Sequence, residues 1–452
     1  MMYKNYNHHL IFIILCQLLN VVFGQQFNPG PLFGHAAVYV EPRNNIYYIG
    51  GYNYNNPPED SNISNTSSEF FYLDLQINSA NFSKFIDLKS QGVNLPLSVH
   101  HNAEVGGVNQ DSIFIIEGLI LDEINNSTLY KFDTNTNELS VPVIQGNAPP
   151  IRKGMRSVSY EGKIYLFGGQ TGSGTDLILF SRFDIFDTIN LNWQVGSLVN
   201  SPVTRTLYTA TLVKGVIYYI GGRKQRNNFS PITEIYQYDI VRNTWSLKTA
   251  TTASTENMPG SRAGHSAILV DDKIYVYGGF FSSNDTSYDL PAKETLAILD
   301  STTLVWSIPS LQNPNIPNLA YHTATIVNTL MIISFGNRTD LPNQIDQTNS
   351  LSYEFFLEDP QNILWYPMTS DNITDSQIPS SFLPDPNAKL DPQRPSSSGK
   401  MVLVFTSIGS VVVVLTIFVA ISLAYRRTKR NKIRTDPFDD GKVTHQQFAT
   451  SQ

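Results

Sequence analysis

The chain has 452 residues, a formal net charge of −7 and one cysteine, Cys16. The acidic balance argues against nucleic acid or an anionic membrane surface as the ligand of its main domain. A single cysteine excludes a fold stabilised by disulfide bonds, and a chain of this length can bury a large apolar core without them.

Residues 1–24 have the pattern of a secretory signal peptide. Lys4 precedes the apolar run Leu10–Phe23, and Gly24 supplies a small residue at the expected cleavage site. Cys16 lies inside this segment, so the mature chain is expected to contain no cysteine.

Residues 33–368 contain six copies of one phrase, at a period near fifty residues. Each copy has an apolar strand, a second strand that ends in a glycine pair, and a third strand with aromatic residues and Asp. Such a period predicts radially repeated β-sheets. The glycine pairs are Gly50-Gly51, Gly168-Gly169, Gly221-Gly222 and Gly278-Gly279, with degraded copies at Glu117-Gly118 and Phe335-Gly336.

An Asp followed six residues later by Trp marks the last four copies. These are all the tryptophans of the chain, and we expect them to pack between adjacent sheets. Ala80 and Leu139 stand at the Trp position of the first two copies. The pairs are Asp187 with Trp193, Asp239 with Trp245, Asp300 with Trp306, and Asp359 with Trp365.

The segments RAGHSAILVDDKIYVYGG and RTLYTATLVKGVIYYIGG resemble the repeats of the kelch family. The resemblance covers nearly all of residues 25–370 and implies an all-β fold, a six-bladed β-propeller whose first strands line a central channel. How the ring closes is left open, because no spare strand is visible unless Gln25–Asn28 supplies one. The expected blades cover about 33–90, 99–147, 152–199, 205–250, 262–310 and 318–368.

Three further segments follow the repeats. Residues 371–400 are rich in Ser, Pro, Asp and Asn, which predicts a flexible stalk. Residues 401–425 contain no charged side chain and are long enough for a transmembrane helix. Residues 426–452 carry seven basic and three acidic residues, which predicts a disordered cytoplasmic tail that contacts anionic lipid of the inner leaflet.

Nine Asn-x-Ser/Thr sequons all lie between the predicted signal peptide and the predicted span. This one-sided distribution predicts a single-pass type I glycoprotein, most simply of the plasma membrane, with the propeller in an extracellular or lumenal position. In the tail, Asp436-Pro437-Phe438 resembles a short motif that recruits clathrin adaptors. The sequons begin at Asn62, Asn65, Asn81, Asn125, Asn126, Asn228, Asn284, Asn337 and Asn372.

Arg152, Arg205 and Arg262 share one register, sixteen residues before the first glycine of their pair. Arg223 lies in a loop that follows a glycine pair, and that loop belongs to the same face. In kelch domains that bind acidic peptides, arginines at the shared position contact the ligand, so the resemblance makes these residues candidate ligand contacts. A solvated arginine, or a structural one bonded to a neighbouring blade, is the favoured alternative.

His265 and His322 each lie thirteen residues before the first glycine of a pair, in strands that the resemblance places around the channel. A ring of histidines there could bind a metal, but a buried and hydrogen-bonded role is favoured because no cluster has metal-ligand spacing. Galactose oxidase, a copper enzyme, also contains a kelch propeller, but its Tyr–Cys cofactor needs a cysteine that the mature chain lacks. We expect no metal and no cofactor.

The chain contains no GxSxG motif and no phosphate-binding glycine loop, and its acidic residues are scattered over loops. The sequence therefore favours a binding module, for adhesion or sensing of a protein or glycan ligand, over an enzyme. An extracellular carbohydrate-active enzyme with paired carboxylates is the alternative.

Overall fold

The computed structural model describes residues 27–368 with several gaps. The predicted signal peptide, stalk, membrane span 401–425 and tail lie outside the described residues. Within the described part, no helix has the length and apolar character needed to cross a membrane. The gaps are residues 53–68, 76–83, 96–97, 100–101, 117–118, 121–128, 173–175, 226–227, 255–256, 283–288, 314 and 342–347.

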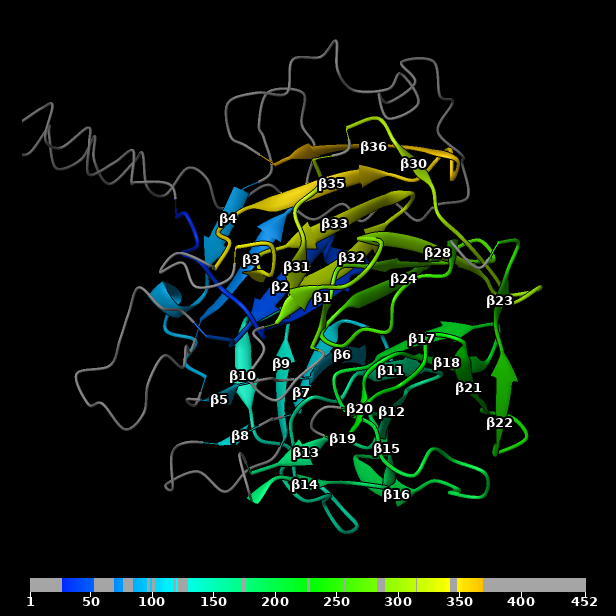
Figure 1. Ribbon diagram of the computed structural model, residues 1–452. Helices are drawn as coiled ribbons and strands as arrows, with labels where there is room; N and C mark the ends of the chain where they lie inside the picture. The colour runs from blue at the N-terminus through cyan, green and yellow to red at the C-terminus, as the bar shows by residue number, and fades with distance from the viewer. Residues whose placement is uncertain are drawn as a thin grey trace, which may run out of the picture. The chain divides into compact units, whose positions relative to one another are not determined.

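Six antiparallel sheets follow one another around a common centre, which confirms the predicted all-β, six-bladed propeller (Figure 1). Within each sheet the strands keep their chain order from the centre outward. The first three blades consist of β1 (Ala36–Val40), β2 (Asn45–Ile49), β3 (Phe70–Asp74) and β4 (Lys84–Asp87); β6 (Asn102–Gly106), β7 (Ser112–Ile116), β9 (Leu129–Asp133) and β10 (Glu138–Ser140); and β11 (Ser157–Tyr160), β12 (Lys163–Phe167), β15 (Phe183–Asp187) and β16 (Asn192–Val195).

The last three blades repeat this plan, and two of them gain a short parallel strand on the outer edge. These edge strands are β23 (Thr251–Thr252) beside β29 and β30 (Ser310–Leu311) beside β36. The blades consist of β17 (Thr209–Val213), β18 (Val216–Ile220), β21 (Glu234–Asp239) and β22 (Thr244–Thr249); β24 (Ser266–Val270), β25 (Lys273–Tyr277), β28 (Leu296–Asp300) and β29 (Val305–Ser307); and β32 (Thr323–Val327), β33 (Leu330–Ser334), β35 (Ser352–Phe356) and β36 (Asn362–Pro367).

Short two-stranded pairs and 3-10 turns lie in the connections between these strands. They are β5 (Ser98–Val99) with β8 (Leu119–Ile120), β13 (Gln170–Thr171) with β14 (Ile178–Leu179), β19 (Arg223–Gln225) with β20 (Asn228–Phe229), β26 (Phe280–Phe281) with β27 (Leu290–Pro291), β31 (Leu319–Ala320) with β34 (Asn337–Arg338), and the 3-10 turns η1 (Glu41–Arg43) and η2 (Lys89–Gln91).

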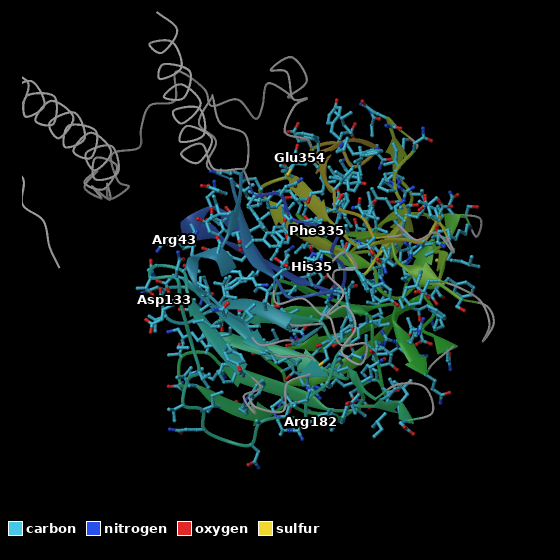
Figure 2. The ribbon with its side chains drawn as sticks, turned by 90° about the vertical axis from the view of Figure 1, so that its left-hand side faces the viewer. His35, Arg43, Asp133, Arg182, Phe335 and Glu354 are labelled. Atoms are coloured by element: carbon cyan, nitrogen blue, oxygen red, sulfur yellow. The ribbon has the colours of Figure 1, made fainter. Side chains whose placement is uncertain are left out.

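The ring closes by direct packing of blade 6 against blade 1, without a blade shared between the two ends of the chain. The N–H of Gly336 donates to the carbonyl of Leu32 at 2.8 Å, and the hydroxyls of Tyr48 and Ser334 lie 2.8 Å apart. In the interior, the rings of His35 and Phe335 meet edge to face at 5.3 Å (Figure 2). Residues 27 and 28 form no strand, so the described part of Gln25–Asn28 does not supply a spare one.

A series of backbone hydrogen bonds joins the described residues of blades 1, 3, 4, 5 and 6 at one end of the channel. Tyr321 donates to Gly264, Gly264 to Leu207 and Leu207 to Gly154, with N···O distances of 2.8, 2.9 and 2.6 Å. Gly34 completes the step from blade 1 to blade 6 by donating to Tyr321 at 2.8 Å. All five residues have φ between 55° and 72°. We call these five residues the mouth ring.

The glycine pairs exist because the next blade's backbone approaches them closely. The second glycine donates its N–H to that backbone: Gly222 to Arg262 at 2.8 Å and Gly279 to Leu319 at 2.7 Å. A Cβ on the first glycine, Gly278, would overlap the carbonyl oxygen of Leu319. Only a residue without a side chain fits such a contact.

The four tryptophans occupy equivalent buried sites on the outer strands, as predicted. Each lies opposite an apolar residue of the third strand; Trp306, for example, pairs with Leu299. Leu139 holds the same place in blade 2, opposite Phe132. In blade 1 the residue in that place is Phe85, because the connection between β3 and β4 is longer than in the other blades. The predicted Ala80 lies outside the described residues.

The recurrent Asp organises the turn between the third and fourth strands. The Asp300 carboxylate accepts N–H bonds from Thr302 at 3.0 Å and Thr303 at 2.8 Å, and the Thr303 bond in particular lowers the pKa of Asp300. Blade 6 departs from this register. Its third strand ends at Phe356, and Asp359 lies within a longer turn, where it accepts from the N–H of Gln361.

Replacing Gly278 with Ala should destabilise the propeller by about 3 kcal/mol or more, because an added Cβ would force the backbones of blades 5 and 6 apart. Gly92→Ala is the matched control. Gly92 also has positive φ, at 91°, but nothing lies within 4 Å of the added Cβ. Denaturant unfolding should give a cost of about 1 kcal/mol for the control. Equal costs would show that backbone strain, and not inter-blade contact, requires the glycine.

Candidate functional site

A cavity of about 150 Å³ runs along the axis of the propeller. The first strands of all six blades line it, and one position of these strands carries only small side chains. Because the side chains there are small, the channel is open enough to hold several water molecules. The small residues are Ala37, Ala103, Ser157, Ala210, Ala267 and Ala324.

Glu104 and Arg156 are the two ionisable side chains that line this cavity. The Ser157 hydroxyl donates to Glu104 at 2.8 Å. Burial raises the pKa of Glu104 to about 7, although this hydrogen bond and the charge of Arg156 oppose the shift. Burial also lowers the pKa of Arg156. Both residues are partly buried and line the cavity.

Three buried histidines connect neighbouring blades beside the channel. The Nε2 atoms of His265 and His322 lie 3.2 Å from the Thr209 hydroxyl and 2.7 Å from the Ser266 hydroxyl. His35 closes the series at 2.8 Å from a hydroxyl of blade 6. Burial, with a contribution from the charge of Arg156, lowers the pKa of His35 to about 3, and His322 shifts alike. These rings are therefore neutral and hydrogen-bonded, the role that the sequence analysis favoured.

In the described part of the chain, no group of three or more His, Cys, Asp or Glu side chains is arranged to hold a metal ion. Each of the three histidines uses one ring nitrogen for a hydrogen bond to a neighbouring blade. The partner in each bond is a hydroxyl side chain, which lies between one histidine and the next. The site therefore has the character of a polar channel.

One face of the propeller surrounds the mouth ring. Segments just before each first strand pair there with segments just after each glycine pair, for example Thr206 with Arg223 and Ala263 with Phe280. The second glycine also anchors the hairpin that follows it, since Ser230 donates to the Gly222 carbonyl at 2.8 Å. We call the surface formed by β13–β14, β19–β20 and β26–β27 the hairpin face.

Aromatic side chains and Arg223 cover the hairpin face near the channel. The Arg223 guanidinium lies over the rings of Phe280 and Phe229, at 4.5 and 5.1 Å from their centroids. It also lies 3.9 Å from the Asp289 carboxylate, which accepts a hydrogen bond from Tyr321 at 3.3 Å. These contacts hold a cation in a fixed position at the rim of the channel.

The three in-register arginines are buried, so the expectation that they form an exposed ligand face is corrected. Arg152, Arg205 and Arg262 have 2%, 0% and 0% of their surface exposed. Arg152 pairs with the buried carboxylate of Asp184 at 2.5 Å. Arg262 donates to the carbonyls of Gly260, Gly278 and Lys293. Their position recurs because each guanidinium binds groups of its own blade. Arg223 stays accessible, with 19% of its side chain exposed.

Two of the predicted glycosylation sites lie in the described part. Asn228 is exposed in β20, on the hairpin face. Asn337 is half-buried in β34, and its side-chain oxygen accepts a hydrogen bond from Thr348 at 3.1 Å. The other seven sequons lie outside the described residues.

The sequence analysis missed Glu104 and Arg156. A signal for Arg156 was present in the sequence. His265, His322 and their equivalents in the other blades share one position, which we call the histidine position. The residue directly after it is small or neutral in five blades and is an arginine only in blade 3. The comparable residues are Ala36, Asn102, Thr209, Ser266 and Thr323. Glu104 gave no such signal, because a charged residue within a half-buried strand is not unusual.

Comparison with known proteins identifies the repeats. The family model described as "KLHDC2/KLHL20/DRC7 Kelch-repeats domain" matches residues 34–279 and 199–371. Kelch domain-containing protein 3 of Bos taurus is 26% identical over 203 residues, 42% of this chain and 50% of that protein. The leucine-zipper-like transcriptional regulator 1 homolog of Drosophila melanogaster is 25% identical over 276 residues, 57% of this chain and 26% of that protein.

The match thus spans about half the length of the first of these relatives and less of the other. Among solved structures, "Structure of YjhT" aligns with a TM-score of 0.56 over 75% of this chain and 98% of that one, at 12% identity. A likeness at that identity concerns the fold alone.

Replacing Arg262 with Met should destabilise the domain by at least about 2 kcal/mol, because one buried and two partly buried carbonyls lose their donor. Arg262→Lys should not restore the stability, since an ammonium cannot reproduce the fork of donors. The control is Arg242→Met, at a side chain that is 78% exposed. Urea unfolding measures all three variants, and an Arg262→Met protein as stable as the control would contradict the structural role.

Proposed function

This chain belongs to the kelch-repeat family, and we propose that it is a protein-binding propeller whose partner docks on the hairpin face. Kelch propellers are typically protein-binding modules. The observation that carries the proposal for this chain is that the hairpin face exposes apolar side chains around a fixed cation. Protein interfaces commonly combine apolar or aromatic anchors with arginine.

The apolar side chains come from two different hairpins. Ile178 of β14 is 57% exposed, Phe281 of β26 is 37% exposed and Leu290 of β27 is 40% exposed. Phe281 lies 5.0 Å from the ring of Phe229, so its ring extends the aromatic surface that holds Arg223. A partner that covers these groups would remove their apolar area from water, which favours association.

The hairpins are held in place before any partner binds. Backbone bonds tie them to the glycine pairs, and Arg223 is fixed between two rings and a carboxylate. A preorganised surface loses less conformational entropy on binding than mobile loops do. A glycan ligand is the second candidate, supported by the stacked rings of Phe33 and Tyr52, 4.9 Å apart, near the mouth ring.

We further propose that the propeller is displayed outside the cytoplasm by a single membrane span. Support comes from the sequence alone: the uncharged run 401–425, the basic cluster that follows it and the distribution of the sequons. In this arrangement the tail 426–452 contacts anionic lipid, and Asp436-Pro437-Phe438 offers a site for clathrin adaptors. A role in adhesion or sensing at the cell surface follows.

The triple variant Ile178→Ser, Phe281→Ser, Leu290→Ser tests the hairpin face. These side chains are partly or largely exposed, so the fold should persist while partner binding weakens by about tenfold or more. Proximity labelling by the full-length chain in cells measures the neighbouring proteins, and those enriched by the native chain should be lost.

The matched control changes three exposed valines elsewhere on the propeller: Val108→Ser, Val195→Ser, Val241→Ser. It removes a similar apolar area outside the hairpin face. Loss of the same neighbours in the control, with retention in the hairpin-face variant, would place the binding surface elsewhere and refute the proposal.

Topology is tested separately. Glycosidase treatment should lower the apparent mass of the expressed protein, because the nine sequons would face the secretory lumen. A tag placed after Gln452 should resist protease added to intact cells, and detergent should abolish that protection. Cleavage of the tag from outside would reverse the assignment.

A further inference from the structure

The residue directly after the histidine position forms a hydrogen bond between blades in three of the six blades. Its hydroxyl bonds the histidine of another blade, as Thr209 does with His265 and Ser266 with His322. Blade 3 has Arg156 at this position, and blade 4 has Tyr208 where a histidine would stand. Tyr208 bonds backbone carbonyls, those of Phe167 and Arg156. The Arg156 side chain therefore does not form the hydrogen bond to a histidine that the residue at its position forms in three other blades.

The described part of the protein gives the Arg156 guanidinium few hydrogen-bond partners. Its one hydrogen bond in the described chain runs from Nη2 to the carbonyl of His322, at the long distance of 3.4 Å. A guanidinium has five N–H donors, and a desolvated charge favours partners for all of them. No ion pair within 4.0 Å joins it to Glu104 in the described part of the chain.

Glu104 is the opposite charge in the same cavity, on the neighbouring blade. The Ser157 hydroxyl and the N–H of Ser159 bond its carboxylate, which leaves further acceptor capacity. The other lining groups are small apolar, hydroxyl or amide side chains, and the nearby histidines are neutral because their pKa values are lowered. The channel thus presents one cation and one anion, separated from each other, in a polar space of about 150 Å³.

We propose that the channel binds a small zwitterion of the amino-acid class, with its carboxylate at Arg156 and its ammonium at Glu104. A ligand with both charges neutralises both groups, whereas a simple anion would meet the repulsion of Glu104 and a simple cation that of Arg156. The site is distinct from the exposed apolar surface of the hairpin face and does not depend on a protein partner.

Calorimetric titration of the purified full-length chain with glycine, β-alanine and γ-aminobutyrate tests the proposal. At least one of them should bind with Kd below about 10 mM. Acetate and methylammonium, each with one charge, should bind about tenfold more weakly or not at all. Absence of binding by all three amino acids, or acetate binding as well as the best of them, overturns the proposal.

Glu104→Gln and Arg156→Gln should each weaken binding of the best probe by about tenfold or more. Gln at position 104 keeps an acceptor for Ser157, so this variant carries the test if the arginine variant does not fold. Arg242→Gln, at an exposed surface pair, is the control and should bind as the native chain does. Unchanged binding in Glu104→Gln overturns the proposal.

The pH dependence gives an independent readout. The ligand needs Glu104 ionised, and burial raises the pKa of Glu104 to about 7 in the free channel. Binding should therefore weaken as the pH falls through that value, and it should be accompanied by proton release near it. Arginine stays protonated over this range, and the three described histidines stay neutral because burial lowers their pKa values. The dependence should vanish in Glu104→Gln; its persistence there would assign it to another group and refute the role of Glu104.

Discussion

The structure depends on backbone hydrogen bonds between blades at the mouth of the channel. Each blade is a small sheet that could not bury its faces alone, and in the described residues the mouth ring with the second glycines joins blades 3, 4, 5, 6 and 1 in turn. Because Gly34 donates to Tyr321 and Gly336 donates to Leu32, the last blade is held to the first as the others are to one another. Ring closure therefore needs neither a shared blade nor a disulfide.

Most of this architecture could be predicted from the sequence because its constraints are local and repeated. A Cβ at Gly278 would overlap the next backbone, and Trp306 must fill the space beside Leu299 in its own sheet, so both leave a visible signal in each copy. Prediction was weakest where a copy has an altered connection. The longer connection before β4 puts Phe85 in the Trp place, and the longer turn before β36 separates Asp359 from the end of its strand. Spacing alone cannot reveal such insertions.

The candidate site was harder to predict, for a physical reason. Arg205 and Arg262 recur in register, and recurrence suggested a common ligand surface. The structure buries both, with their guanidinium groups directed at carbonyls and carboxylates of their own blades. A residue that recurs in several blades is selected by the packing that recurs in those blades. Arg156 appears at its position only once, so no repeated packing explains it, and its environment becomes visible only when the blades are assembled around the channel.

This distinction follows from symmetry. A propeller surrounds its axis with nearly equivalent strands, but a small ligand or a protein surface has no such rotational symmetry. A binding site must therefore be built from residues that break the repeat. Glu104 and Arg156 do so on adjacent blades inside the channel, and Arg223 does so on the hairpin face, between two phenylalanines. The buried arginines recur and stabilise individual blades, whereas Glu104, Arg156 and Arg223 each occur in one blade only. The residues that recur thus maintain the scaffold, and those that do not are where recognition of a ligand can arise.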